Sequence, residues 1–224
     1  MRVLLRDPSL ADEDVSAFLA ALPGWITGGA RTLNLRNNQH TFTAVLRGHP
    51  LIVKRYLNAA TFPASLRPLS STRPWRSWHA ASRLNAAGVS TPRPLLLVAT
   101  DRDLIIAYER LDATELYQLL RDPVLLARHE PGLPAELRKL FGSLANARAT
   151  HGDLHARNIL VDQAGRAWLI DLDGLRLHRF AFAYNRRRQR EEDRLGASLE
   201  KARPSLREAC GFTRTDSDAP WRWL

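Results

Sequence analysis

The chain has 224 residues and a formal net charge of +10, from 33 Lys and Arg against 23 Asp and Glu. This length allows one compact unit with a buried core, or two small lobes. Hydrophobic residues make up 45% and charged residues 25%, which excludes a disordered chain. The one cysteine, Cys210, excludes an internal disulfide framework and a cysteine-based zinc site, and it fits a reducing compartment.

The basic excess favours a polyanionic partner such as nucleic acid, an anionic membrane surface or a phosphorylated substrate. An arginine-rich proteome would give the same excess, so charge alone does not decide the function. Residues 1–14 include acids where a secretion signal needs an apolar core. The apolar runs Leu95–Ala99 and Leu104–Ala107 are too short to cross a bilayer. We therefore expect a cytoplasmic protein.

The first half of the chain predicts a β-rich lobe. Apolar residues at helical spacing after an acidic start predict a short helix over Asp12–Leu22. Strand-favouring residues from Thr41 to Tyr56 surround Gly48-His49-Pro50 and predict a hairpin. The second arm of this hairpin carries Lys54 among apolar neighbours.

A longer helix and a second hairpin follow. The helix is predicted from Trp75 to Ala87, because Gly88 and then prolines end the pattern. Apolar runs at Leu95–Val98 and Leu104–Tyr108 flank the turn Asp101–Asp103 and predict the second hairpin.

The second half is predicted to be mainly helical. Helical patterns cover residues 114–120 and 134–148, and a charged helical segment begins at Arg186. Short strands are predicted at Ile159–Val161 and Ala167–Ile170.

The character of the sequence changes at Glu109–Ala113. We therefore expect residues 1–110 to form the N-terminal lobe and residues 111–224 the C-terminal lobe of one domain. The predicted fold class is α+β, with a β-rich N-terminal lobe that has one helix and a mainly helical C-terminal lobe.

The most informative stretch is His151–Asn158, HGDLHARN, followed at a short interval by the tetrapeptide IDLD, which contains Asp171. Asn158 enters a strand that is predicted to turn at Asp162–Gly165 and to return to Asp171. Paired strands lie about 5 Å apart, so this hairpin brings Asn158 beside Asp171, with Asp153 just upstream. Amide and carboxylate oxygens placed in this way suit Mg²⁺.

Phosphoryl transfer needs Mg²⁺ on the phosphates, a lysine on the phosphates, and a carboxylate that orients the acceptor hydroxyl. Lys54 can supply the lysine and Asp153 the carboxylate. These parts in this order resemble the kinase-like superfamily, and in detail the bacterial lipopolysaccharide kinases of the Kdo/WaaP/InaA family. The resemblance extends from about residue 28 to residue 195 and includes further motifs: Val53-Lys54-Arg55-Tyr56, Gly88–Pro94 and Tyr108-Glu109-Arg110-Leu111.

The resemblance implies a bilobal protein-kinase-like fold and a role for each matching residue. Asp153 would be the catalytic carboxylate, and Asn158 and Asp171 would bind Mg²⁺. Lys54 would contact the α- and β-phosphates of ATP. His151 is expected to hold the loop by hydrogen bonds.

Further residues are implied to contact the nucleotide. Glu109 and Leu111 belong to the hinge-like segment that would line the nucleotide. Members of the wider superfamily carry a glycine-rich phosphate loop before the lysine, but here Leu33–His40 is polar and rich in asparagine. Its backbone, or Asn37 and Asn38, are the candidates to cover the phosphates.

A second departure concerns the helix that ends before Gly88. Its expected glutamate partner for Lys54 is missing, and Ser77 occupies that place. Asp173 could reach the cation, although a loop-capping role is the simpler interpretation. His155 and Arg157 are either surface residues or contacts on the substrate side.

The leading hypothesis is an ATP-dependent phosphotransferase that acts on a sugar hydroxyl, of heptose or Kdo, in the lipopolysaccharide core. Its partners would be ATP with Mg²⁺, the anionic glycolipid, and the inner face of the inner membrane. Five arginines are candidates for the anionic surface: Arg179, Arg186, Arg187, Arg188 and Arg190. Because residues 191–193 are all acidic, a solvated helix face is the alternative.

Two other functions stay open. A soluble small-molecule phosphotransferase of the aminoglycoside or choline type would need an acidic pocket for its cationic substrate. A non-catalytic kinase-like binding protein would explain the missing glutamate. A nucleic-acid-binding module is disfavoured, because aromatic residues do not alternate with the arginines in a stacking pattern.

Overall fold

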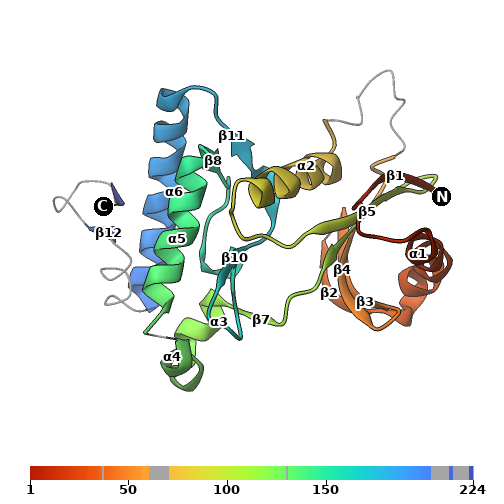
Figure 1. The fold of residues 1–224 in the computed structure, drawn as a ribbon, viewed down its shortest axis with the longest axis horizontal. Coiled ribbons are helices and arrows are strands. Elements are labelled where there is room, and N and C mark those ends of the chain that lie inside the picture. Colours follow the sequence, from red (N-terminus) through yellow and green to blue (C-terminus); the bar gives the residue numbers. More distant parts are fainter. Residues whose placement is uncertain (37, 61–70, 130, 203–211, 214–221, 224) are drawn as a thin grey trace. The chain divides into compact units, whose positions relative to one another are not determined.

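The computed structural model describes the chain except for residues 37, 61–70, 130, 203–211, 214–221 and 224 (Figure 1). The chain forms two compact units, the first made of residues 1–82 and 92–110 and the second of residues 83–91 and 111–224. Residues 83–91 join the second unit because Ser90 and Thr91 bind strand β10 (Ala167–Leu169). The Ser90 carbonyl accepts from the Leu169 amide at 2.9 Å, and the Thr91 hydroxyl donates to the Leu169 carbonyl at 2.8 Å.

The first unit contains a six-stranded antiparallel sheet in the order β1-β5-β6-β4-β3-β2. Its elements are β1 (Arg2–Arg6), α1 (Asp12–Gly24), a π-helical turn (Trp25–Gly29), β2 (Arg31–Arg36), β3 (Gln39–Leu46), β4 (His49–Tyr56), α2 (Arg73–Ala86), β5 (Pro94–Ala99) and β6 (Leu104–Glu109). Both predicted hairpins are confirmed. In the first, Arg47 and Gly48 have φ of 48° and 86°, as a two-residue type I′ turn requires.

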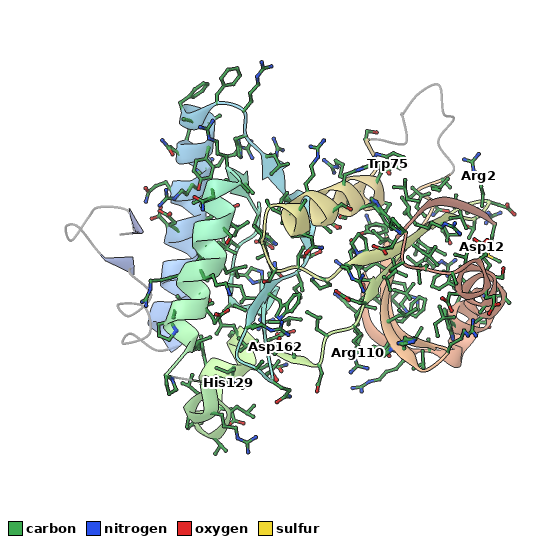
Figure 2. The ribbon with its side chains drawn as sticks, viewed as in Figure 1. Arg2, Asp12, Trp75, Arg110, His129 and Asp162 are labelled. Carbon is green, nitrogen blue, oxygen red and sulfur yellow. The ribbon has the colours of Figure 1, made fainter. Side chains whose placement is uncertain are left out.

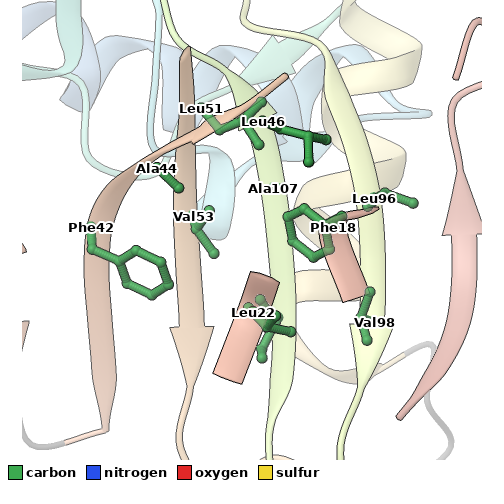
Figure 3. Packing of buried hydrophobic residues seen from close by; sticks show 11 residues of the cluster. Phe18, Leu22, Phe42, Ala44, Leu46, Leu51, Val53, Leu96, Val98 and Ala107 are labelled. Atoms are coloured by element: carbon green, nitrogen blue, oxygen red, sulfur yellow. The ribbon is translucent and has the colours of Figure 1, made fainter. Parts of the chain in front are cut away.

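One face of this sheet packs against α1. The strand period of two places Leu51 and Val53 of β4 on that face, where they are buried. Phe18 and Leu22, one helical turn apart on α1, are fully buried among them, together with Phe42 of β3 (Figure 3). The predicted helix over Asp12–Leu22 is therefore confirmed, and its Phe18 and Leu22 belong to this core.

The other face carries a second buried cluster with α2. Trp78 of α2 packs with Tyr56, Leu97 and Ile106. Lys54 lies on the same face, because it is two residues from Tyr56 and pairs with Ile106 across the sheet. In the described part of the first unit, α1 and the part of α2 that belongs to it pack on opposite faces of the sheet, and Lys54 lies on the α2 side.

The segment Leu33–His40 is not a loop before the lysine strand. It forms the end of β2 and the beginning of β3, whose register runs from Arg31 opposite Thr43 to Arg36 opposite Gln39. The sequence did not predict β2, because polar residues, asparagine among them, have a low intrinsic preference for strands. The turn of this hairpin includes Asn38.

The second unit is mainly helical and has small sheets. Its elements are β7 (Ala113–Glu115), α3 (Leu116–Arg121), α4 (Pro123–His129), α5 (Leu133–Asn146), β8 (Ala149–Thr150), a 3₁₀ turn (Ala156–Asn158), β9 (Ile159–Asp162), β10, a second 3₁₀ turn (Leu172–Gly174), β11 (Arg176–Leu177), α6 (Ala181–Ala202), β12 (Phe212–Thr213) and β13 (Arg222–Trp223). The predicted strands β9 and β10 are confirmed as an antiparallel pair, and β7 adds a third strand that the sequence did not predict. The α+β class is confirmed. Among the described residues, no helix has both the length and the apolar character that a membrane span needs.

The α1 core predicts a large stability effect at Phe18. Phe18→Ala should lower the free energy of unfolding by about 3–5 kcal/mol, because a fully buried aromatic ring is replaced by a cavity. Chemical denaturation followed by tryptophan fluorescence would measure it, since Trp25 lies 5.4 Å from the Phe18 ring. Val45→Ala is the control: Val45 is exposed, and the change should stay within about 0.5 kcal/mol. Equal effects of both substitutions would contradict the assigned core.

Candidate active site

The hairpin of β9 and β10 brings the two predicted metal ligands to one end. Leu169 pairs with Ile159, and the amide of Ile170 donates to the Asn158 carbonyl at 3.0 Å. Asn158 and Asp171 are therefore neighbours where the hairpin opens. At the closed end, Asp162 accepts hydrogen bonds from the backbone amides of the turn, which confirms it as a turn former (Figure 2).

His151 fastens the preceding loop to the same end of the hairpin. Its ring is fully buried, and Nε2 donates to the Ile170 carbonyl at 2.8 Å while Nδ1 accepts from the Asp153 amide at 3.3 Å. Burial lowers the pKa of His151, with the hydrogen bond to Ile170 and nearby carboxylates opposing the shift. A neutral imidazole with one donor and one acceptor matches both partners. The expected structural role of His151 is confirmed.

Gly152 and Gly174 allow this loop to touch the turn after β10. Gly152 has φ of 91°, and a Cβ there would lie 2.7 Å from the Gly174 carbonyl oxygen. A Cβ on Gly174 would lie 3.0 Å from the His151 carbonyl oxygen. Any larger residue at position 152 would be strained and would push the two loops apart.

Asp153 points its carboxylate to solvent, with 64% of the side chain exposed, but both of its oxygens have partners. Oδ1 accepts from Arg194 Nη1 at 2.9 Å, and Oδ2 lies 3.4 Å from His155 Nε2. Because His155 Nδ1 accepts from the Arg157 amide, the neutral tautomer carries its proton on Nε2 and can donate to Asp153. His155 is thus a contact of the predicted catalytic residue, while Arg157 lies 4.4 Å over the Tyr117 ring.

Asn158 and Asp171 offer oxygens of the kind that Mg²⁺ prefers. Asn158 is nearly buried, and its Nδ2 donates to the Asp153 carbonyl at 2.9 Å, which fixes the amide and orients its oxygen. Asp171 is exposed and has a left-handed backbone, φ 63° and ψ 58°, which is uncommon outside glycine and concentrates at functional sites.

The donor set fits Mg²⁺ better than a softer metal. Within the described part of the chain, no group of three or more His, Cys, Asp or Glu side chains could hold a metal ion. Mg²⁺ needs no such cage, because it keeps several waters and binds through one or two carboxylates plus phosphate oxygens. Asn158 and Asp171 are the residues that would hold it.

Helix α6 anchors the loop through residues that sequence reasoning missed. The Glu191 carboxylate accepts from the His151 amide at 3.0 Å and from the Gly152 amide. Arg194, one turn further along α6, donates to the Gly152 carbonyl at 3.3 Å as well as to Asp153. Charged residues at helical spacing look the same in sequence whether they bind solvent or a loop. Only the spacing of three between Glu191 and Arg194 hinted at a shared face.

The acidic residues that follow the arginine cluster are not all solvated, because Glu192 is buried. Only 2% of Glu192 is exposed, and it pairs with Arg188. Burial raises the pKa of Glu192 to about 7, although the hydrogen bond and charge of Arg188 oppose the shift. Arg188 therefore does not belong to the basic surface in which it was grouped by sequence.

The predicted nucleotide contacts lie mostly in the first unit. Lys54 is half-buried in β4, between Thr41 of β3 and Ile106 of β6. Glu109 ends β6, and its carboxylate accepts from the Arg93 amide at 2.9 Å. Leu111 is half-buried and begins the long segment of the second unit.

Of the two asparagines predicted to cover the phosphates, the structure describes only Asn38. Asn37 lies outside the described residues. Asn38 belongs to the β2–β3 turn, and its carbonyl accepts from the Leu57 amide at 3.0 Å. Ser77 is fully buried on α2, and α2 contains no acidic residue, so the missing glutamate is a feature of the folded helix too.

The lysine strand in a β-rich unit and a loop-plus-hairpin site in a helical unit are the features of a kinase-like protein. Comparison with known sequences agrees. The sequence model of the Lipopolysaccharide kinase (Kdo/WaaP) family matches residues 51–219, and the chain belongs to that family.

Individual relatives are similar over parts of their length. The 3-deoxy-D-manno-octulosonic acid kinase of Vibrio vulnificus is 30% identical over 142 residues, 61% of this chain and 57% of the relative. The kinase of the same name from Photobacterium profundum is 27% identical over 178 residues, 75% of this chain and 73% of the relative. The one from Haemophilus influenzae is 32% identical over 112 residues, 47% and 46% of the two chains. The matched region thus spans less than two thirds of the V. vulnificus relative.

The α6 anchor predicts a local loss of order. In Glu191→Ala, the amides of His151 and Gly152 lose a charged acceptor, so their hydrogen exchange should accelerate by about 10–100-fold. Amide exchange read by NMR would measure this without any assay of activity. Glu136→Ala on α5 is the matched control and should leave both amides unchanged. Unaltered exchange in Glu191→Ala would show that the loop does not depend on α6.

Proposed function

We propose that the protein is an ATP-dependent phosphotransferase whose acceptor is a sugar hydroxyl, of Kdo or heptose, in the lipopolysaccharide core. The observation that carries the proposal is the end of the β9–β10 hairpin, where Asn158 and Asp171 are neighbours and Asn158 also binds the loop of Asp153. Family membership supports the same chemistry, and the relatives named above are kinases of 3-deoxy-D-manno-octulosonic acid.

Each residue has a step in this proposal. Asp153 accepts a hydrogen bond from the acceptor hydroxyl and takes its proton as the hydroxyl oxygen bonds to the γ-phosphorus of ATP. The bond from that phosphorus to the β–γ bridging oxygen breaks, and ADP leaves. Asn158 and Asp171 hold Mg²⁺, which when bound neutralises phosphate charge.

The nucleotide contacts complete the proposal. Lys54 binds the α- and β-phosphates as a point charge. Glu109 and Leu111 line the nucleotide, and Asn37 and Asn38 cover the phosphates.

Arg194 and His155 prepare Asp153 for this role. Arg194 donates to Oδ1, and His155 Nε2 lies 3.4 Å from Oδ2, so each carboxylate oxygen has a neighbour that orients it before the acceptor arrives. The His155 contact is the longer one at 3.4 Å, and Oδ2 is therefore the oxygen that an acceptor hydroxyl can share. Positioning of this kind is the main source of rate in phosphoryl transfer, because the reaction needs little covalent help from the protein.

We propose further that the second unit associates with an anionic membrane surface from the cytoplasmic side. Phe180 and Phe182 are 60% and 76% exposed, and their rings stack at 6.1 Å at the start of α6. Leu177 is exposed just before them, and Arg179 lies over the Phe180 ring. Aromatic rings beside basic groups suit the headgroup region of a bilayer.

A non-catalytic kinase-like protein is the second candidate. The observation in its favour is the absence of any acidic residue from α2, which faces the side of the sheet that carries Lys54. Turnover measurements separate it from the leading proposal.

The catalytic assignment predicts two different defects. Asp153→Asn should lower turnover by about 10²–10⁴-fold with the affinity for Mg²⁺–ATP retained, because only the proton acceptor is lost. Asp171→Ala should abolish Mg²⁺-dependent ATP binding while the protein stays folded by circular dichroism. Transfer of γ-labelled phosphate from ATP to core lipopolysaccharide and calorimetric titration of Mg²⁺–ATP measure the two effects. Glu136→Gln is the control, and wild-type turnover in Asp153→Asn would refute the assignment.

The membrane proposal predicts that Phe180 and Phe182 contribute more to vesicle binding than exposed apolar residues elsewhere do. Phe180→Ser combined with Phe182→Ser should weaken sedimentation with phosphatidylglycerol–phosphatidylethanolamine vesicles by at least about tenfold, because each ring loses its apolar burial. Val124→Ser on α4, where the side chain is 67% exposed, should have no effect. If the wild-type protein does not sediment with these vesicles, the membrane part of the proposal fails and the phosphotransferase part is untouched.

A further inference from the structure

A pocket of about 510 Å³ lies between α6 and the loop of the candidate active site. Four arginines of α6 line it, together with Gly152 of the loop and Phe182: Arg186, Arg187, Arg190 and Arg194. We call it the arginine pocket. It lies wholly within the second unit.

Folding does not explain the charge of the arginine pocket. Arg190 lies three or four residues from each of the other three arginines, so the four line one face of α6 and repel one another. Arg194 is neutralised by Asp153. Among the described residues, Arg186, Arg187 and Arg190 form no ion pair with a carboxylate. Glu191 also lines the pocket, but its carboxylate accepts from the loop amides.

The arginine pocket adjoins the atom that would receive the acceptor's proton. Gly152 lines it and precedes Asp153 in the loop. Arg194 lines it too, and the same guanidinium donates to Asp153 Oδ1 at 2.9 Å. A ligand in the pocket would therefore be separated from Asp153 only by the Arg194 side chain. One sugar is large enough to place one group in the pocket and another at Asp153.

We propose that the arginine pocket binds the anionic group of the acceptor, a carboxylate carried by the sugar acid, and so places the neighbouring hydroxyl at Asp153. This inference rests on the proposed phosphotransferase function and identifies the part of the acceptor that the protein recognises. Arg187 and Arg190 are the specificity-determining residues, and Arg194 links the bound carboxylate to the catalytic loop.

The chemistry of the pocket selects an anion that presents paired oxygens. A guanidinium group presents paired N–H donors that match the two oxygens of a carboxylate, and such charge-assisted pairs are about twice as strong as neutral ones. The cationic sugars of an aminoglycoside would be repelled here. A neutral sugar would form no charge-assisted hydrogen bond with these guanidinium groups, so it would bind more weakly than the acid.

The test pairs two changes, one in the protein and one in the ligand. The protein variant is Arg187→Gln combined with Arg190→Gln, and the ligands are an alkyl glycoside of 3-deoxy-D-manno-octulosonic acid and its methyl ester, which lacks the charge. In the wild-type protein the acid should have a KM about 10–100-fold lower than the ester. In the variant the KM of the acid should rise to that of the ester, because the acid loses its charged partners, while the KM for ATP should stay near the wild-type value. Arg128→Gln combined with Arg138→Gln, on α4 and α5, removes the same charge elsewhere and should keep the preference.

Binding without turnover separates this inference from the proposed function. Calorimetric titration of the acid and the ester in the absence of ATP needs no catalysis. If the wild-type protein binds the acid in preference to the ester but transfers no phosphate, the proposed function fails and the arginine pocket stands, provided that the variant loses the preference.

Two results would overturn the inference. One is equal binding of acid and ester by the wild-type protein. The other is a preference for the acid that survives in Arg187→Gln/Arg190→Gln. Loss of vesicle sedimentation in this variant with the preference intact would show that the arginines serve lipid phosphates instead.

Discussion

The loop of Asp153 and the turn after β10 meet backbone to backbone at Gly152 and Gly174. A Cβ at position 152 would come within 2.7 Å of the Gly174 carbonyl oxygen, so the contact requires glycine at position 152. This closeness lets His151 reach the Ile170 carbonyl and lets Asn158 reach the Asp153 carbonyl. The neighbouring positions of Asp153, Asn158 and Asp171 follow from that single approach of two chain segments.

Helix α6 also holds the loop of Asp153, because its charged residues have different partners. Glu191 turns inward to two loop amides, Arg194 reaches the Asp153 carboxylate, and Arg186, Arg187 and Arg190 line the pocket beside Gly152. One helix therefore holds the loop backbone, orients the Asp153 side chain and supplies the cations of the pocket. An anion bound by these arginines would compete with Asp153 for Arg194, so the proposed acceptor site and the orientation of Asp153 would be coupled.

The sequence predicted the hairpins and the polar residues at the end of β9–β10, because strand periodicity, turn residues and a short interval determine that geometry locally. It could not predict the role of Glu191 or Arg194, since their partners lie about forty residues away and surface charges have no periodicity that distinguishes a loop contact from solvent. The sequence did not predict β2, because its composition is polar and does not favour a strand. The structure shows that pairing with β3 holds it in a strand.

The missing glutamate on α2 changes how Lys54 can be held. Position 77 is fully buried, and a glutamate there would have to be desolvated, a cost that only a well-formed ion pair with the lysine repays. Serine avoids that cost. Lys54 lies between Thr41 and Ile106 on one of the two central strands of the six-stranded sheet. A lysine binds phosphate as a point charge and needs less angular precision than an arginine. A buried serine in place of the glutamate is therefore compatible with the proposed binding of phosphate by Lys54.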